Sequence, residues 1–328
     1  MRTILATGAG ALIGQGIIRS LNNSVDRQVI HVIGIDRNKD THARYLCDKF
    51  IQKPPVEETS AEYLDFWSNL ISDNRVDMIL PGIEDDVVFF NQCRQSSVAL
   101  PAFLNSPKTL ALGLDKYALS EFANVNNILA IPTALASDSQ SIKKLDLTRR
   151  KTIVKPRASN GSRGIFRFEG YGEIKAFLEK KNIEELSHYI VQPYIGSHEE
   201  EYTASIFGFG DGTYEGPIAF KRLLAKEGYT KYAKTVEPTH EVLLSIDTVA
   251  KSCLPVGPTN FQFRKHDKHY FLMEINPRFS STTSVKAAFG FDETQMAMRY
   301  FFNGEKSFSL SFLHGEAWRH TCDFIKYT

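Results

Sequence analysis

The sequence predicts an α/β protein, and two observations support this fold class. Over the first hundred residues, apolar runs of strand length alternate with amphipathic helical runs, which is typical of a parallel sheet covered by helices. From residue 201 onwards, paired runs of aromatic and branched residues are joined by short polar turns, which indicates antiparallel hairpins. At 328 residues the chain is long for one core, so we expect two or three packed units.

Composition narrows the class of protein. Apolar residues make up 42% and charged residues 23%, the profile of a soluble globular protein. With 39 basic and 38 acidic residues the net charge is +1, so neither nucleic acid nor a membrane is an expected partner. The four cysteines are widely spaced, which argues against a zinc site or a disulfide framework and indicates buried thiols in a reducing compartment. We find no signal peptide and expect a cytoplasmic protein.

The first unit opens like a nucleotide-binding fold. A strand at 2–7 leads into a glycine turn at 8–14 and a helix to about Leu21, and a second strand at 29–35 ends at Asp36. Three residues separate Gly10 from Gly14, whereas the dinucleotide-binding pattern has two. An NAD-dependent epimerase or dehydrogenase built on this turn is therefore kept as an alternative.

The alternation continues to about residue 95. We expect helices at 62–74 and 84–95, with a strand at 76–80 between them. Glu84 and Asp85 follow the carboxyl end of that strand, where open α/β sheets place ligands, so either could touch a substrate. Acidic residues in the first turn of a helix also stabilise the helix dipole, so a structural role is the other interpretation.

Two runs near residue 270 predict a metal-binding hairpin. Residues 260–263 and 271–276 have strand patterns, and residues 266–268 supply the turn between them. Side chains two apart share a face of a strand, so Glu274 and Asn276 point the same way, and the partner strand can bring Gln262 beside them. One carboxylate and two amide oxygens suit Mg²⁺ that also binds substrate phosphates. The alternative is an edge hairpin with a solvated polar face.

A second, independent pattern indicates phosphate binding. A strand that ends at Lys155 runs into a polar loop, residues 156–164, with two glycines and two arginines. Backbone amides freed by glycine, together with fixed positive charge, are what a triphosphate needs.

Taken together, the Val-Lys-Pro and glycine loop of residues 154–164 and the Glu-Ile-Asn-Pro-Arg run of residues 274–278 resemble the ATP-grasp superfamily. Within it, the chain is similar to one half of the carbamoyl-phosphate synthase large subunit. The resemblance implies an α/β ATP-grasp fold with a Rossmann-like preATP-grasp domain at 1–107. It implies a linker and lid subdomain at 108–190, and a C-terminal subdomain with the metal site at 191–328.

The resemblance also implies roles for single residues. Lys116 and Lys155 would contact the ATP phosphates, and Arg278 would act with Lys155 in catalysis by holding an acyl phosphate. Glu201 would accept from a ribose hydroxyl, with Glu199 as the alternative. The remaining nucleotide contacts would come from the glycine loop and the hinge strand: Gly161, Ser162, Arg163, Gly164, Gln192, Pro193, Tyr194 and Ile195. Pro193 has no N–H, so the adenine donor would be Tyr194 or Ile195.

The expected function is that of an ATP-dependent carboxylate–amine ligase with ATP and Mg²⁺ as cofactors, Mn²⁺ being a possible substitute. Alternatives are phosphorylation of bicarbonate or carbamate, as in the synthase it resembles, and a nucleotide-binding regulator without turnover. The expected partners are a small carboxylate and an amine, and a homodimer on base rates. Residues 301–328 receive no role.

Overall fold

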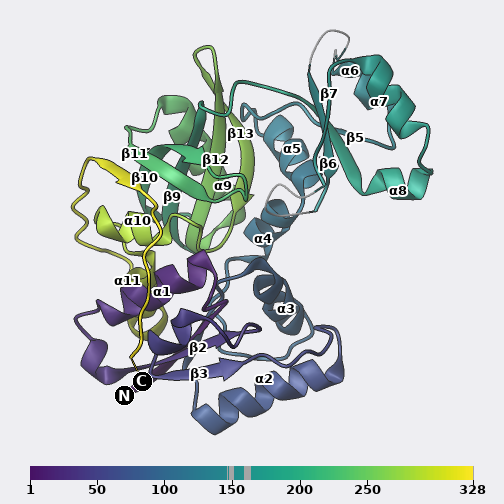
Figure 1. The fold of residues 1–328 in the computed structure, drawn as a ribbon. Helices are drawn as coiled ribbons and strands as arrows, with labels where there is room; N and C mark the ends of the chain where they lie inside the picture. The colour runs from purple at the N-terminus through teal and green to yellow at the C-terminus, as the bar shows by residue number, and fades with distance from the viewer. Residues whose placement is uncertain (146, 148–150, 159–163, 328) are drawn as a thin grey trace.

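The computed structural model describes residues 1–145, 147, 151–158 and 164–327. The described residues form three sheets, which occupy successive parts of the chain (Figure 1). The mixed α/β class predicted from the sequence is confirmed.

The N-terminal sheet is four-stranded and parallel, in the order β3-β2-β1-β4. The long helices lie on both of its faces, because α1 packs with one apolar cluster and α2 and α3 with the other. The elements are β1 (Arg2–Thr7), α1 (Leu12–Asn22), η1 (Arg27–Val29), β2 (Ile30–Asp36), η2 (His42–Tyr45), β3 (Lys49–Gln52), α2 (Ala61–Asn74), β4 (Met78–Leu80) and α3 (Glu84–Gln95).

Close packing explains the glycines of the first turn. A Cβ on Gly14 would lie 2.1 Å from the carbonyl oxygen of Gly8, and one on Gly82 would lie 2.2 Å from that of Thr7. Helix α1 and the segment after β4 therefore approach β1 more closely than any side chain permits.

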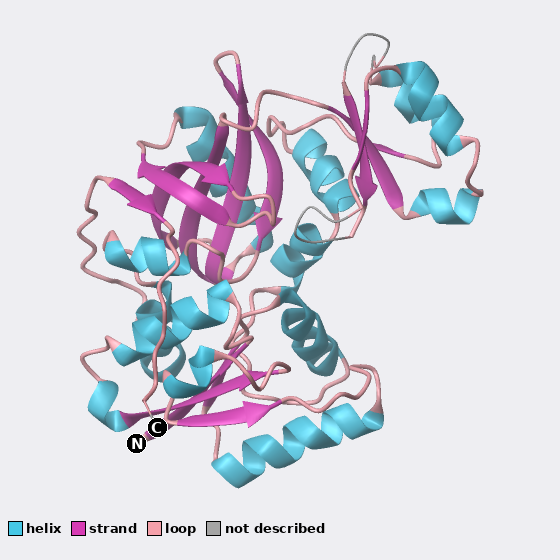
Figure 2. Cartoon of the chain, viewed as in Figure 1, coloured by secondary structure: helices cyan, strands magenta, loops and turns pink. Residues whose placement is uncertain are grey.

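The second sheet belongs to the part that projects to the upper right of Figure 2, in the order β5-β8-β6-β7. Helices α4 and α5 connect it to the N-terminal unit. The elements are α4 (Pro107–Leu114), α5 (Lys116–Val125), β5 (Ala134–Leu135), α6 (Ser139–Lys144), β6 (Thr152–Pro156), β7 (Phe166–Phe168), α7 (Tyr171–Leu178), α8 (Ile183–Ser187) and β8 (Tyr189–Pro193).

The third sheet is the largest and is antiparallel, in the order β13-β12-β9-β10-β11-β14. Helices α5 and α9 pack on one face, while α1 and α11 cover part of the other. The elements are β9 (Glu201–Phe209), β10 (Tyr214–Leu224), β11 (Thr230–Thr235), α9 (His240–Cys253), β12 (Val256–His266), β13 (His269–Asn276), α10 (Thr283–Ala288), α11 (Glu293–Asn303) and β14 (Glu316–Trp318).

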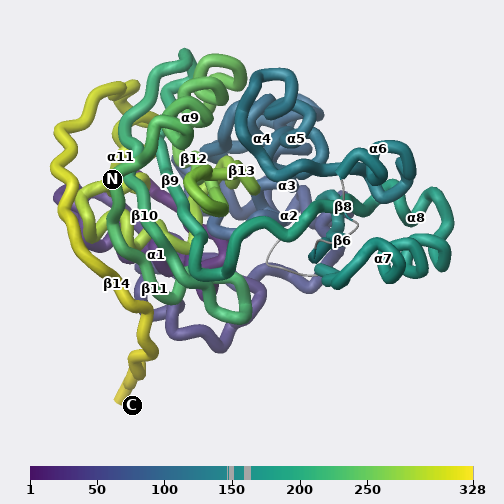
Figure 3. Tube along the Cα trace, turned by 90° about the horizontal axis from the view of Figure 1, so that it is seen from above, coloured from purple at the N-terminus to yellow at the C-terminus, as the bar shows by residue number. Residues whose placement is uncertain are grey.

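The C-terminal segment crosses between units. Strand β14 pairs with the edge strand β11, and the chain then runs back toward the N-terminal unit, along one side of the molecule in Figure 3. Near its end, the ring of Phe324 stacks on Tyr45 with the ring centroids 5.5 Å apart.

One sequence expectation was wrong. Not all cysteines are buried, since Cys47 is half-buried and Cys322 exposed, although all four are free thiols. Among the described residues, no helix has both the length and the apolar character needed to cross a membrane.

Candidate nucleotide and metal site

One face of the central sheet changes from polar to apolar along its strands. On β9 the alternating side chains Glu201, Thr203 and Ser205 are followed on the same face by Phe207 and Phe209. The two phenylalanines belong to the core shared with the N-terminal unit, whereas the first three residues are buried polar groups. Buried polar side chains are retained where they have partners or a function, so this end of the face is the place to look for a site.

The expected hairpin is present, with Gln262 directly opposite Glu274 and Asn260 opposite Asn276. Side chains of directly opposed residues lie on the same face of a sheet, so Gln262, Glu274 and Asn276 share one face. Asn260 is fully buried below them, and its side-chain oxygen accepts hydrogen bonds from Thr203 at 2.6 Å and Ser205 at 2.8 Å.

The three expected metal ligands fit a cation that arrives with phosphates. Among the described residues, no hydrogen bond or ion pair engages the side chains of Gln262, Glu274 or Asn276, so their oxygens are available. The described part of the chain contains no group of three or more His, Cys, Asp or Glu side chains that could hold a metal ion. A single carboxylate is too little charge for a protein-only Mg²⁺ site, whereas nucleotide phosphates would complete it. The metal role itself stays a prediction.

Lys155 lies near this face, at the end of β6. Its ammonium interacts electrostatically with Glu274 and Glu201, and also with the cations Lys116 and Arg264. Burial, together with the neighbouring positive charges, lowers the pKa of Lys155 to about 8. An ammonium with a depressed pKa in a cationic environment is stabilised when an anion binds beside it.

A cap and an ion pair bring Lys116 to the same place. Asp115 caps α5 by accepting from the N–H groups of Tyr117 and Ala118, as its position in the sequence predicts. Its carboxylate also pairs with Arg157, at 2.6 Å from Nη2, and the backbone N–H of Lys116 donates to the carbonyl of Arg157. The start of α5 is thus fixed to the end of β6, which carries Lys155.

Glu201 lies between two arginines. It is directly opposite Arg222 on β10 and Arg264 on β12, and its oxygens accept from their Nη2 atoms at 2.7 and 3.0 Å. All three side chains are at least nine-tenths buried, and the Nε atoms of both arginines have no hydrogen-bond partner among the described residues. Each carboxylate oxygen has a second lone pair, so the expected ribose contact remains compatible with this pairing. Glu199, the alternative, is exposed.

The hinge strand narrows the choice of adenine donor. The N–H of Tyr194 donates to the carbonyl of Lys151 at 2.7 Å, which leaves the N–H of Ile195 as the candidate. Gln192 is buried, and its Nε2 donates to Thr133, so only its side-chain oxygen could accept from a nucleotide. Pro193 is buried beside them.

Three of the expected glycine-loop contacts, Gly161, Ser162 and Arg163, lie outside the described residues. Gly164 is described and has a φ of +68°, where a side chain would be strained.

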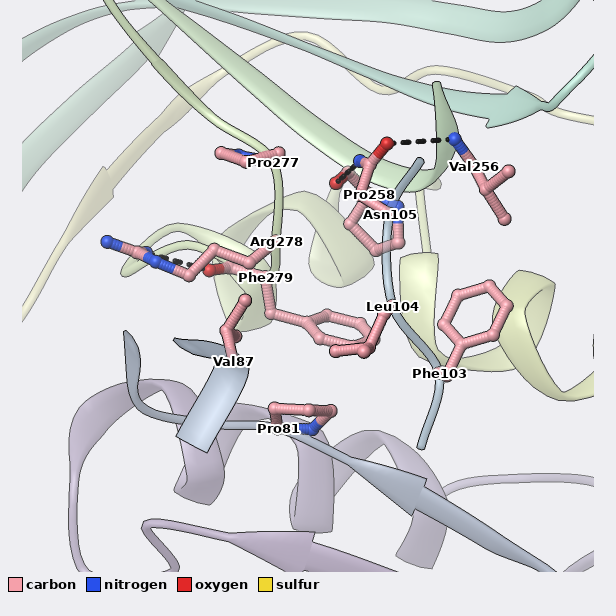
Figure 4. Close-up of a pocket in the computed structure, with 10 residues that line it drawn as sticks. All are labelled: Pro81, Val87, Phe103, Leu104, Asn105, Val256, Pro258, Pro277, Arg278 and Phe279. Carbon is pink, nitrogen blue, oxygen red and sulfur yellow. Dashed lines mark hydrogen bonds between the residues drawn. The ribbon is translucent and has the colours of Figure 1, made fainter. Parts of the chain in front are cut away.

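Arg278 is joined to the N-terminal unit. Its Nε and Nη2 donate to one carboxylate oxygen of Glu84 at 2.9 and 2.6 Å, and both side chains are mostly buried. Beside them lies a small apolar pocket, in which Phe279 and Leu104 face each other while the guanidinium of Arg278 points away (Figure 4). This pocket is packing between the two units, and Nη1 of Arg278 donates to the carbonyl of Phe279 at 3.1 Å.

Sequence reasoning missed several members of this site. Arg222, Asn260 and Arg264 lie in strands where alternation only marks them as polar. The register of the strands could have revealed the two arginines, because Arg264 and Arg222 lie directly opposite Glu201 on the two neighbouring strands.

The N-terminal glycine turn shows a structural use of its acid. One oxygen of Asp36 accepts from the N–H of Gly10 at 2.8 Å, and the other from that of Asn38 at 2.9 Å. The acid that would hold a dinucleotide ribose is thus already bonded to the backbone.

Comparison with solved structures identifies the fold. The biotin carboxylase domain of Hydrogenobacter thermophilus 2-oxoglutarate carboxylase, solved as a dimer with MgADP, ADP and bicarbonate, superposes with a TM-score of 0.75 at 14% identity, over 96% of this chain and 73% of that one. Biotin carboxylase from Campylobacter jejuni gives 0.73 at 15% identity, over 96% and 74%.

Staphylococcus aureus N5-carboxyaminoimidazole synthetase with ADP gives 0.68 at 14%, over 97% and 80%. No protein-family model matches the chain, and no curated protein matches its sequence. The chain therefore has the ATP-grasp fold, and the fold expected from the sequence is confirmed at that level.

Proposed function

We propose that this chain is an ATP-dependent ligase that phosphorylates a substrate carboxylate and passes the acyl group to an amine. The observation that carries the proposal is the charge on one side of the hairpin. Within the described part of the chain, Glu201 pairs with Arg222 and Arg264, and the ammonium of Lys155 interacts with Glu201, Glu274, Lys116 and Arg264. A cluster rich in cations is suited to a polyanion such as a triphosphate.

In the proposed reaction, Lys155 and Lys116 bind the phosphates and Ile195 orients the adenine. Glu274, Gln262 and Asn276 would hold Mg²⁺, which would supply positive charge to neutralise the terminal phosphates. The carboxylate oxygen forms a bond to the γ-phosphorus as the bond to the β-phosphate oxygen breaks, giving an acyl phosphate and ADP. Such a reaction needs position and charge more than a nucleophile of the protein.

The acceptor side is assigned to Arg278 and the first turn of α3. Arg278 carries a planar fork suited to a carboxylate or acyl phosphate, and Glu84 holds that fork in place. When the amine attacks the acyl carbon, phosphate leaves and the amine must lose a proton. Glu84 is the carboxylate nearest to Arg278 in our proposal and is the candidate to receive it.

The similar structures include a biotin carboxylase domain and N5-carboxyaminoimidazole synthetase, with ADP and, in one case, bicarbonate bound. Bicarbonate is therefore the second candidate acceptor of the phosphoryl group. The division into domains 1–107, 108–190 and 191–328, the preATP-grasp character of the first, a cytoplasmic location and a homodimer stay predictions.

The test begins with calorimetry of Mg·ATP binding, followed by ADP release with bicarbonate and a panel of amino acids, and hydroxylamine trapping of any acyl phosphate. Glu274→Ala should lower ADP release about 100-fold, a size typical for loss of a preorganised charge-stabilising group. Glu62→Ala, which removes an exposed carboxylate from α2, is the control. Absence of nucleotide binding, or equal rates in the two variants, would refute the proposal. If the protein binds Mg·ATP but releases no ADP with any acceptor, a nucleotide-binding regulator without turnover would be supported instead.

A further inference from the structure

The C-terminal segment has a specific contact with the acceptor side of the site. Immediately after β14, Arg319 donates through Nη2 to the carbonyl of Ser281 at 2.6 Å and through Nε to the carbonyl of Thr230 at 3.1 Å. Its backbone N–H also donates to the carbonyl of Lys231 at 2.8 Å. One side chain therefore joins two segments that are about fifty residues apart in the sequence.

Both of these segments border the proposed acceptor site. Ser281 lies three residues after Arg278, in the loop between the metal hairpin and α10. Thr230 begins β11, is buried, and accepts through its hydroxyl from Arg222 Nη1 at 3.5 Å, the arginine that pairs with Glu201. The hydroxyls of Thr230 and Ser281 are themselves 3.4 Å apart. A path of direct contacts thus leads from Arg319 to both the Arg278 loop and the Glu201 cluster.

The chemistry of the contact favours a positioning role over a surface ion pair. Arg319 is half-buried, and within the described part of the chain no carboxylate pairs with its guanidinium. Burial and the nearby Arg19 lower the pKa of Arg319. A guanidinium held on two backbone carbonyls fixes the direction of each, because its N–H groups form a rigid planar fork.

The same loop is held from inside by another cation. Lys286 is fully buried and donates to the hydroxyl of Ser280 at 3.2 Å, next to Ser281. The loop is therefore fixed at adjacent residues, internally by Lys286 and externally by Arg319. Only the second contact comes from the C-terminal segment.

We propose that Arg319 is a positioning residue of the acceptor side, which holds the loop after Arg278 against the start of β11 and so sets the place of the carboxylate substrate. This inference rests on the proposed function. It assigns Arg319 to the acceptor side of the site, although sequence analysis predicts no role for residues 301–328.

The first test needs no turnover. Hydrogen exchange of residues 279–284 and 228–233 is compared among the unaltered protein, Arg319→Ala, Arg319→Lys and the control Lys234→Ala. Lys234 pairs with Glu316 in the same pair of strands but is exposed, so the control disturbs β14 without touching the two carbonyls. We expect about tenfold faster exchange in both segments for Arg319→Ala, as for loss of hydrogen bonds from a charged donor, and none for the control. Unchanged exchange in Arg319→Ala would overturn the inference.

The second test separates positioning from general stability. In Arg319→Ala we expect the KM for the carboxylate acceptor to rise about tenfold while the Kd for Mg·ADP stays within about twofold, with Arg319→Lys in between. A parallel loss of Mg·ADP affinity would overturn the inference, because the site as a whole would then have been disturbed. Lack of Mg·ADP binding by the unaltered protein would instead refute the proposed function, and this is measured before any variant.

Discussion

Two buried ionic clusters lie on the same face of the central sheet, and they differ in how completely their charges are balanced. In the closed cluster, Lys286 and Glu293 are both fully buried, and the lysine donates to Glu293 at 2.6 Å, to Ser205 at 3.1 Å and to Ser280 at 3.2 Å. In the open cluster, Glu201 accepts from two arginines, and the Nε atoms of both arginines have no hydrogen-bond partner within the described parts of the chain. In the closed cluster, one positive charge faces one negative charge, and the three N–H groups of Lys286 make three hydrogen bonds. In the open cluster, two guanidinium groups share one carboxylate, so hydrogen-bond donors and positive charge are in excess.

This difference separates structural from functional use of buried charge. A closed cluster has no unpaired charge or donor for a ligand, so its interactions affect only the stability of the protein. An open cluster keeps hydrogen-bond donors unsatisfied at a cost to stability, which a bound anion can offset. Variants of the closed cluster should therefore change stability most, and variants of the open side should change ligand binding and turnover.

The largest effect is expected for Lys286→Met. This change leaves Glu293 buried without its partner, which should lower the free energy of unfolding by about 3–5 kcal/mol. The double variant Lys286→Met with Glu293→Met removes both charges and should recover most of the loss. Urea midpoints measured by circular dichroism check both. If the single variant is as stable as the unaltered protein, the pairing of Lys286 with Glu293 does not stabilise the fold, and the distinction between the two clusters is wrong.

The opposite pattern is expected for Glu274→Gln, on the open side. Glu274 is half-buried and lacks a hydrogen-bonded partner among the described residues, so the free energy of unfolding should change by less than about 0.5 kcal/mol. Acceptor-dependent ADP release should nevertheless fall about 100-fold. A matched pair of urea and kinetic measurements tests this separation, which fails if stability and turnover fall together.

The sequence predicted the parts of the fold that depend on periodicity. Strand β1 and helix α3 were expected at their observed bounds, because alternation and amphipathic spacing are local properties. The hairpin around Glu274 was expected in its observed place, although β12 extends well beyond the expected run 260–263. Strand β3 was missed, since four residues with a half-exposed pattern give too short a signal. Helix α11 was missed as well, although Asp292 caps it.

Only the site residues that belong to sequence motifs could be predicted. Lys155 and Glu274 stand in recognisable runs, and the structure brings them near each other. The arginines beside Glu201 come from strands β10 and β12, and their meeting depends on register, which a single sequence does not specify. The contact of Arg319 with Ser281 depends on how the C-terminal segment crosses the fold, which is set by tertiary structure alone.

A smaller effect should appear in the pH dependence of nucleotide binding. Because the pKa of Lys155 is lowered to about 8, its ammonium is lost as the pH rises through that value, and the attraction for phosphates is lost with it. Mg·ATP affinity should fall about tenfold between pH 7 and pH 9. Calorimetry at several pH values measures the fall, and Lys155→Arg, whose charge persists, should flatten it. An equal slope in that variant would assign the titration to another group.

The same titration should also affect the stability of the free protein, with the opposite sign. A lysine whose pKa is lower in the folded state binds fewer protons there than in the unfolded chain at any pH between about 8 and the ordinary value of 10.5. Stability then rises with pH across this window, since the penalty of a buried ammonium is present below pH 8 and is relieved above it. Other lysines and tyrosines titrate in the same range, so the difference in unfolding free energy between the unaltered protein and Lys155→Gln isolates the contribution. The unaltered protein should gain stability relative to this variant as the pH rises from 8 to 10.5, because the glutamine carries no charge at any pH. A difference that is constant over the window would mean that Lys155 has an ordinary pKa, and the cationic crowding inferred around it would then be wrong.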